Sequence, residues 1–135
     1  MIEIDKEHPE YAAQKAVWSA YRDLYSGGYE FQSRADRYLI ARQREPRDVY
    51  GERLKRVFYE NYVGSIVDWY AATLFRTEPR IAYGDGGNEF FASFVEDCDR
   101  RGTSLFEFFR RQFVESMIAG TSYALVDFPR IEGSV

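Results

Sequence analysis

The sequence predicts a mainly α (α+β) fold of amphipathic helices with one or two short strands, in a single domain over residues 1–135. Three observations favour this class. Apolar residues recur at the 3.6-residue spacing of a helix along several stretches. The 4 prolines and 10 glycines fall mostly at the ends of those stretches. The composition is 45% hydrophobic and 18% aromatic, which indicates a folded core rather than disorder.

The first helix is expected to begin at Pro9, because proline fits the first helical position. Ser26, Gly27 and Gly28 should end it. One side of this helix carries an aromatic stripe, which we expect in the core; the alternative is an exposed platform for a ligand. The stripe consists of Tyr11, Val17, Trp18, Tyr21, Leu24 and Tyr25.

Residues 29–45 are charged and irregular, and they predict an exposed connector with a short helix. Pro46 can open the next helix, and no further proline occurs until Pro79. Residues 46–75 are therefore expected to form one long helix, which is unusual in a small domain.

The apolar stripe of this long helix changes sides near Tyr59 to Tyr62. We expect a continuous helix containing Val57 to Leu74 that bridges two layers or two subunits; a kink at this point is the alternative. In the second half of this helix, the face that the apolar stripe no longer occupies carries small or polar residues. These residues form a contact with another subunit or domain, or they form a solvated face. These residues are Asn61, Gly64, Ser65, Asp68 and Ala72.

The remaining elements are shorter. Residues 80–83 predict a strand, followed by a glycine turn and a helix over residues 88–99. Ser104 and Glu107 form a capping-box pair that should begin a helix ending at Gly120. Residues 122–128 have the composition of a strand and stop at a proline.

The sequence predicts no metal site. Asp97, Asp99 and Gly102 match positions one, three and six of a calcium loop. Arg101 and Phe108 occupy positions five and twelve, where oxygen ligands are needed. A solvated helix end is the favoured interpretation.

Other chemical motifs are also incomplete. Residues 84–87 lack the third spaced glycine and the lysine of phosphate-binding loops. His8 is expected at the surface, and Cys98 stands between two acids that would raise its thiol pKa. One cysteine and one histidine cannot build a disulfide or a usual zinc site. The sequence therefore predicts no enzyme and no cofactor.

The net charge is -4, which argues against tight binding of DNA through its phosphates. The first ten residues lack the pattern of a signal peptide, and no apolar run approaches the roughly 20 residues of a membrane span. A soluble intracellular protein without membrane contact is expected.

Several stretches together resemble the N-terminal part of portal proteins of tailed bacteriophages, the head-to-tail connectors. The resemblance covers about 80 residues and depends on order and spacing rather than on any single motif. The first stretch is the long helix, which carries Tyr50, Arg53, Asn61 and Tyr62, and it is followed by Phe75 before Pro79. The second stretch leads into the helix that ends at Gly120 and consists of Asp99, Gly102, Thr103, Ser104 and Leu105. The third stretch is the closing strand, Ala124 to Pro129.

The resemblance implies a structural subunit of a homo-oligomeric ring, usually of twelve copies, through which DNA is packaged and ejected without sequence-specific binding. It implies contacts with the capsid protein, the terminase and head-completion proteins, and a location in the virion and, during assembly, in the host cytoplasm. It also implies that this chain is a wing-like portion of a longer protein.

A different class remains open. The chain could be a small helical adaptor or regulatory protein that binds a partner protein through its aromatic stripe. An enzyme whose chemistry leaves no recognisable motif is the third alternative.

Overall fold

The computed structural model describes residues 6–82 and 89–127. The described residues form six α-helices and one short 3-10 helix, and they contain no strand, so the prediction of a mainly α fold is confirmed. The elements are α1 Pro9–Ser26, α2 Gly28–Ser33, η1 Ala35–Arg37, α3 Arg47–Lys55, α4 Tyr62–Leu74, α5 Glu89–Glu96 and α6 Leu105–Ala119.

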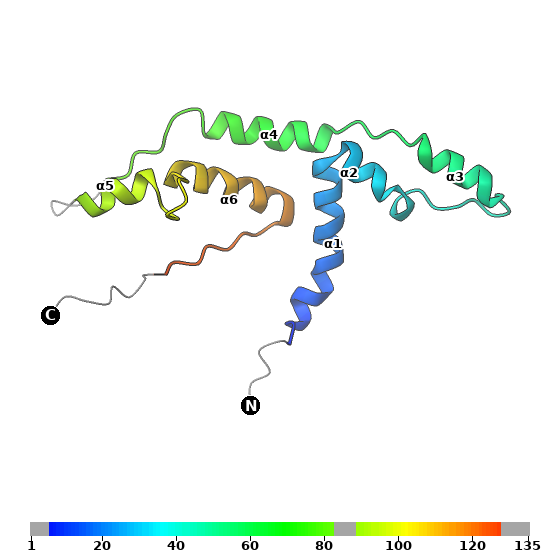
Figure 1. The fold of residues 1–135 in the computed structure, drawn as a ribbon, viewed down its shortest axis with the longest axis horizontal. Coiled ribbons are helices and arrows are strands. Elements are labelled where there is room, and N and C mark those ends of the chain that lie inside the picture. The colour runs from blue at the N-terminus through cyan, green and yellow to red at the C-terminus, as the bar shows by residue number, and fades with distance from the viewer. Residues whose placement is uncertain (1–5, 83–88, 128–135) are drawn as a thin grey trace.

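Three helices meet at the centre of the molecule. α4 and α6 lie side by side and run in opposite directions, while α1 projects steeply away from the end where α4 begins (Figure 1). α1 contacts both α4 and α6. α2 and α3 extend toward one end of the molecule and α5 toward the other, so the arrangement is open and elongated (Figure 1).

Local signals set the ends of α1 and α6, as the sequence predicts. The Nδ1 atom of His8 accepts a hydrogen bond from the backbone N–H of Glu10 at 3.3 Å, and Gly27 ends α1 with a positive φ of 58°. The Ser104 hydroxyl oxygen accepts from the backbone N–H of Glu107 at 3.2 Å. Gly120 closes α6 in the left-handed conformation, at φ 75°.

The prediction of one long helix over residues 46–75 is wrong. Residues 56–61 separate α3 from α4, and α1 is the longest of the described helices. The break lies where the apolar stripe changes sides. There Tyr59 stacks on Phe31, with ring centroids 4.4 Å apart, and Asn61 turns its side chain to cap α4. These two contacts hold the segment in a non-helical path.

The two predicted strands are also absent from the described residues. Arg80 to Ala82 and Ser122 to Asp127 have no regular secondary structure; Tyr83, the glycine turn over 84–87, residue 88 and Phe128 lie outside the described residues. No backbone hydrogen bond joins residues 121–127 to another described segment. An apolar sequence of strand composition needs a partner strand to form a ladder, and none of the described segments provides one.

The buried core is small. Of the described side chains, one charged residue, Asp23, and five hydrophobic residues are buried. The accessible surface of the chain is 11994 Å², whereas a compact monomer of this mass is expected to expose roughly 7,400 Å². None of the described helices combines the length and hydrophobicity needed to cross a membrane. The buried hydrophobic residues are Phe31, Ala35, Val67, Ala71 and Ile118.

The expectation that the aromatic stripe of α1 lies in the core is wrong for half of its residues. Trp18, Leu24 and Tyr25 are partly buried, whereas Tyr11, Val17 and Tyr21 are exposed. Tyr11 and Val17 belong to the N-terminal half of α1, which projects beyond α4 and α6 (Figure 1). Tyr21 lies closer to these two helices, beside an open pocket that Val67 and Ile118 also line, and it stays half exposed.

Candidate interaction surfaces

Three of the five predicted contact residues, Asn61, Gly64 and Asp68, lie where α4 meets the end of α1. The Asn61 Nδ2 atom donates to the carbonyl oxygen of Tyr25 at 2.7 Å, and its Oδ1 atom accepts from the backbone N–H of Gly64 at 2.8 Å. The Tyr25 hydroxyl donates to Asp68 Oδ1 at 2.7 Å. Burial and this hydrogen bond raise the pKa of Tyr25 to about 12. Asn61, Gly64 and Asp68 therefore join two helices of the same chain.

The other two predicted residues differ. Ser65 and Ala72 are exposed, and the Ser65 hydroxyl donates to the carbonyl oxygen of Asn61 at 3.0 Å. The structure shows no hydrogen bond from Ser65 to α1, and the methyl group of Ala72 can form none. Their role in a contact between subunits stays a prediction.

α4 packs through its small residues. A Cβ atom added to Gly64 would lie 2.8 Å from the Tyr25 carbonyl oxygen, so only glycine permits this approach of the two helices. Gly64, Val67 and Ala71 are the buried residues of α4 and fall on one side at helical spacing. The apolar face expected from the sequence is instead largely exposed, including Ile66 and Tyr70.

The outer face of α4 is the part of the helix opposite Gly64, Val67 and Ala71. The sequence analysis did not single out two residues of this face, Tyr62 and Trp69, as contact residues. The signal that could have indicated them is the low number of charged residues in α4, one in thirteen. A helix with so few charged residues usually has more than one of its sides buried. The exposed apolar residues of this face are Tyr62, Ile66, Trp69 and Tyr70.

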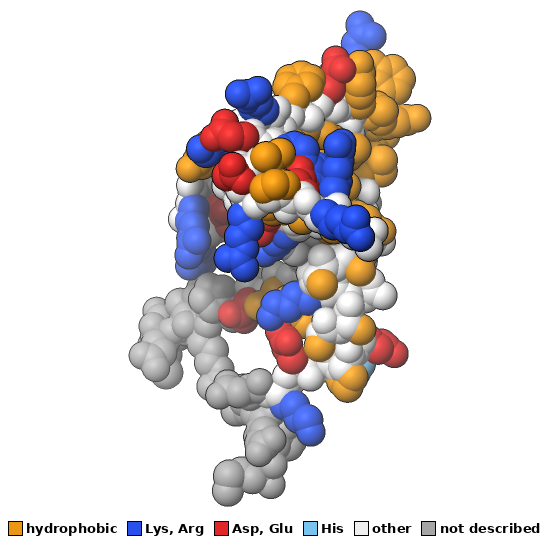
Figure 2. Space-filling view, turned by 90° about the vertical axis from the view of Figure 1, so that its right-hand side faces the viewer, with side chains coloured by type: hydrophobic (Ala, Val, Ile, Leu, Met, Phe, Trp, Pro, Cys, Tyr) orange, Lys and Arg blue, Asp and Glu red, His pale blue; other side chains and the backbone are white. Residues whose placement is uncertain are grey.

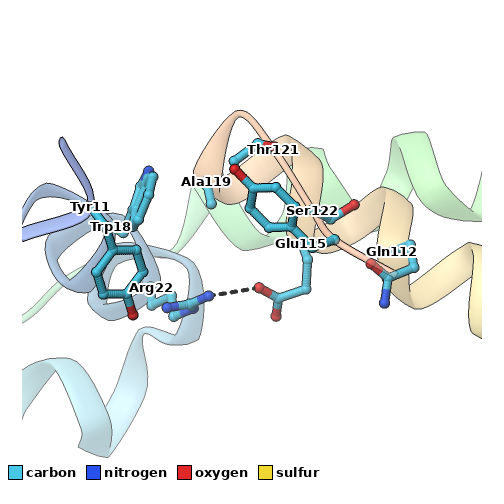
Figure 3. Close-up of a pocket in the computed structure, with 9 residues that line it drawn as sticks. Tyr11, Trp18, Arg22, Gln112, Glu115, Ala119, Thr121 and Ser122 are labelled. Atoms are coloured by element: carbon cyan, nitrogen blue, oxygen red, sulfur yellow. Dashed lines mark hydrogen bonds and ion pairs between the residues drawn. The ribbon is translucent and has the colours of Figure 1, made fainter. Parts of the chain in front are cut away.

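A pocket of about 280 Å³ lies between α1 and the end of α6 (Figure 3). The rings of Tyr11 and Trp18 form one wall, with centroids 5.5 Å apart in an edge-to-face arrangement. Arg22 and Glu115 face one another across the helices in an ion pair of 3.0 Å (Figure 3). The pocket can hold one apolar side chain. The remaining lining residues are Gln112, Ala119, Thr121, Ser122 and Tyr123.

A second pocket, of about 470 Å³, lies between α5 and the extended segment that follows α6. Phe90 and Phe94 stack along it, with centroids 6.2 Å apart. Its other lining residues are Phe91, Ser93, Asp97, Cys98, Arg100, Val126 and Asp127.

The loop that resembles a calcium site uses its carboxylates within the backbone. Asp97 Oδ1 accepts from the N–H groups of Arg101 and Gly102, each at 3.0 Å, and Asp99 Oδ1 accepts from Arg101 at 2.9 Å and from Thr103 at 3.2 Å. Hydrogen bonds to the Thr103 and Arg101 groups hold the pKa of Asp99 below its usual range. These carboxylates cap a turn.

Two further reactive side chains, Cys98 and His8, lie in the described part of the chain. Burial and then the charge of Asp99 raise the pKa of the Cys98 thiol, which disfavours a reactive thiolate. His8 is exposed and serves as the cap of α1. Among the described residues, no group of three His, Cys, Asp or Glu side chains could hold a metal ion.

The end of the molecule where α2 and α3 lie is charged. Figure 2 shows Lys and Arg side chains interspersed with Asp and Glu over this end, with hydrophobic side chains gathered at its upper edge. Several of the arginines have structural partners. Arg53 binds both carboxylate oxygens of Glu45, at 2.9 and 2.7 Å, and the carbonyl oxygen of Ile40 at 2.9 Å. The hydrogen bonds from Arg53 lower the pKa of Glu45.

Comparison with known proteins does not place this chain in a family. No family model matches it, and no curated protein and no solved structure shows significant similarity to it. The exposed surfaces described above and the resemblance in the sequence are therefore the features of this chain that bear on its function.

Proposed function

We propose that this chain is part of a structural subunit of a homo-oligomeric ring of the phage portal type, the head-to-tail connector through which DNA enters and leaves the capsid. The observation that carries the proposal is the exposed outer face of α4. Trp69 is 62% exposed and Ile66 54% exposed on a helix that carries one charge. Such a face is typical of a subunit that is completed by its neighbours.

The open arrangement supports this interpretation. The chain exposes several thousand Å² more than a compact monomer of its mass, and a standard protein–protein interface buries about 1,600 Å² in total. More than one neighbour can therefore be accommodated, as a ring requires.

The remaining parts of the proposal follow from the resemblance. The subunit would act as a structural protein rather than an enzyme, in a ring of about twelve copies. It would contact the capsid protein, the terminase and head-completion proteins in the virion, and it would be found in the host cytoplasm during assembly. DNA would pass without sequence-specific binding, which agrees with the net charge of -4.

Negative-stain electron microscopy of the native gene product tests the proposal. Closed rings of identical subunits with a central channel are the expected result. A product that stays monomeric at every concentration in sedimentation velocity contradicts it.

A helical adaptor is the second candidate, and the pocket beside Trp18 favours it. Tyr11 and Trp18 present aromatic surface next to the Arg22–Glu115 ion pair, which is a suitable docking place for one side chain of a partner helix. An adaptor would bind a different protein instead of forming a ring of identical copies, so the same microscopy and sedimentation experiments separate the two candidates.

A further inference from the structure

The loop that precedes α3 carries three arginines without a partner in the described part of the chain. We call residues 42–47 the arginine loop; it lies at the far end of the molecule, where the chain turns into α3 (Figure 1). The side chains of Arg42, Arg44 and Arg47 are exposed, and none of them forms an ion pair or a hydrogen bond with a described residue. Three guanidinium groups are therefore free to bind an anion.

The acid within the arginine loop does not compete for these groups. The carboxylate of Glu45 binds Arg53 through both of its oxygens, at 2.9 and 2.7 Å. It also accepts from the backbone N–H of Arg42 at 2.9 Å, and the Arg42 carbonyl oxygen accepts from the Glu45 N–H at 3.0 Å. Glu45 is thus neutralised and closes the loop. A loop ordered in this way loses less conformational entropy when it binds a partner.

This end of the molecule differs in charge from the chain as a whole. Residues 42–56 contain six arginines and lysines and three acids, although the net charge of the chain is -4. Of the other two acids, Glu52 pairs with Lys55 at 2.8 Å, and Asp48 is exposed and has no ion pair with a described residue. Salt screens charges more than about 10 Å away, so the local excess of positive charge acts on a partner at this end. The acidic average limits the affinity but does not abolish the attraction.

The arginine loop has the chemistry of a contact with nucleic acid phosphates. The planar fork of a guanidinium matches two phosphate oxygens, and duplex DNA carries one negative charge per roughly 1.7 Å of its axis, so three arginines find phosphates in any register. A protein partner would require three carboxylates at matching positions and an interface core with few charges. Residues 42–48 contain one apolar residue, Pro46, and cannot supply such a core.

We propose that the arginine loop binds the phosphate backbone of a nucleic acid without reading its sequence. The inference goes beyond the proposed function and does not depend on it, because a chain that forms no ring can still bind through this loop. Three phosphate contacts give a slope of about -2.7 for the logarithm of the association constant against the logarithm of the salt concentration on duplex DNA. The affinity should therefore fall about fortyfold between roughly 50 and 200 mM salt.

Fluorescence anisotropy with a labelled DNA duplex of mixed sequence tests the proposal at several salt concentrations. The loop variant carries three substitutions, Arg42→Gln, Arg44→Gln and Arg47→Gln. The control variant removes the same charge from exposed arginines elsewhere that have no ion pair with a described residue, through Arg76→Gln, Arg100→Gln and Arg101→Gln. Circular dichroism verifies that both variants fold.

The loop variant should bind the duplex about tenfold or more weakly than the wild type at roughly 50 mM salt, and its salt slope should be smaller by about two to three. The control variant should keep most of the wild-type slope. Asp48→Asn removes the unpaired acid beside the loop and should tighten binding. Two duplexes of unrelated sequence should bind with equal affinity, because phosphate contacts carry no sequence information.

Three results overturn the inference. A wild-type chain that leaves the duplex unbound at the lowest salt has no surface for nucleic acid. Equal losses in the loop and control variants show that net charge, and not the arginine loop, determines binding. Polyglutamate that displaces the duplex at an equal concentration of charge shows that the loop binds carboxylates, which is the chemistry of an acidic protein partner.

Discussion

Asn61 ties the beginning of α4 to the end of α1 through Tyr25. Its Nδ2 atom donates to the Tyr25 carbonyl oxygen at 2.7 Å, while its Oδ1 atom caps α4 by accepting from the Gly64 N–H at 2.8 Å. One side chain therefore satisfies a free carbonyl at a helix C-terminus and a free amide at a helix N-terminus. The same residue ends the non-helical segment between α3 and α4.

Replacing Asn61 by alanine removes both hydrogen bonds. We expect the free energy of unfolding to fall by about 1–3 kcal/mol, the range for a lost helix cap together with an unsatisfied polar group. Denaturation by urea measures it. Ser65→Ala is the control, since that hydroxyl is exposed and bonds only within its own helix turn; its effect should stay below about 0.5 kcal/mol. Equal effects of the two substitutions would contradict the role of Asn61.

Gly64→Ala should destabilise the protein although alanine is the better helix former. The added Cβ would lie 2.8 Å from the Tyr25 carbonyl oxygen, which forces α1 and α4 apart. In Gly51→Ala on α3, the added Cβ meets nothing within 4 Å, and helix propensity should raise stability by up to about 1 kcal/mol. Melting temperatures that shift in opposite directions confirm the close approach, and a stabilised Gly64→Ala variant would refute it.

Asp23→Ala should destabilise the junction of α1 and α2. Asp23 is 1% exposed and accepts from Arg34, from Arg37 at 3.4 Å, and from the Tyr38 hydroxyl at 2.9 Å. Its removal leaves these donors without their acceptor. The arginines can turn toward water, so we expect a loss of about 1–3 kcal/mol rather than the full cost of a buried unpaired charge.

The matched control for this substitution is Asp36→Ala. Asp36 is an exposed acid in η1, close in sequence to the same arginines. Its replacement removes the same charge and should change the midpoint of chemical denaturation little. A loss as large as that of Asp23→Ala would indicate that net charge, and not the buried hydrogen bonds, determines the effect.

The pH dependence of stability should carry a contribution from Tyr25. Burial first, and then the hydrogen bond to Asp68, raise the pKa of Tyr25 from its ordinary value of 10.0 to about 12. The folded state therefore binds the phenolic proton more tightly than the unfolded state does. This stabilisation is complete below the unfolded pKa and is lost as the pH rises from 10 to about 12. Tyr25→Phe should flatten that part of the stability curve, which denaturation at several alkaline pH values measures; an unchanged slope would contradict the assignment.

Calcium should not stabilise the turn after α5. The Oδ1 atoms of Asp97 and Asp99 already accept backbone N–H groups. We expect the same melting temperature with calcium as with a chelator, and a lower melting temperature for Asp97→Ala under both conditions. A saturable increase in melting temperature with calcium, lost in Asp99→Ala, would show that this turn binds the ion.

The sequence by itself determined those features that depend on neighbouring residues. Pro9 and Gly27 mark the two ends of α1, and Ser104, Glu107 and Gly120 mark those of α6. The sequence shows these ends because helix caps and left-handed glycines act within a few residues. The helical fold class follows from the recurrence of apolar residues at the 3.6-residue spacing of a helix.

Only the tertiary structure decided which side of α4 is inside and where the long helix breaks. Gly64 and Asn61 meet Tyr25, which lies 36 residues from Asn61 in the chain, and Tyr59 meets Phe31. Periodicity ranks faces by hydrophobicity, so it favoured the large apolar residues for the core. The close approach of α1 and α4 favours small residues between the two helices. The large side chains of Trp69 and Ile66 therefore lie on the exposed side of α4.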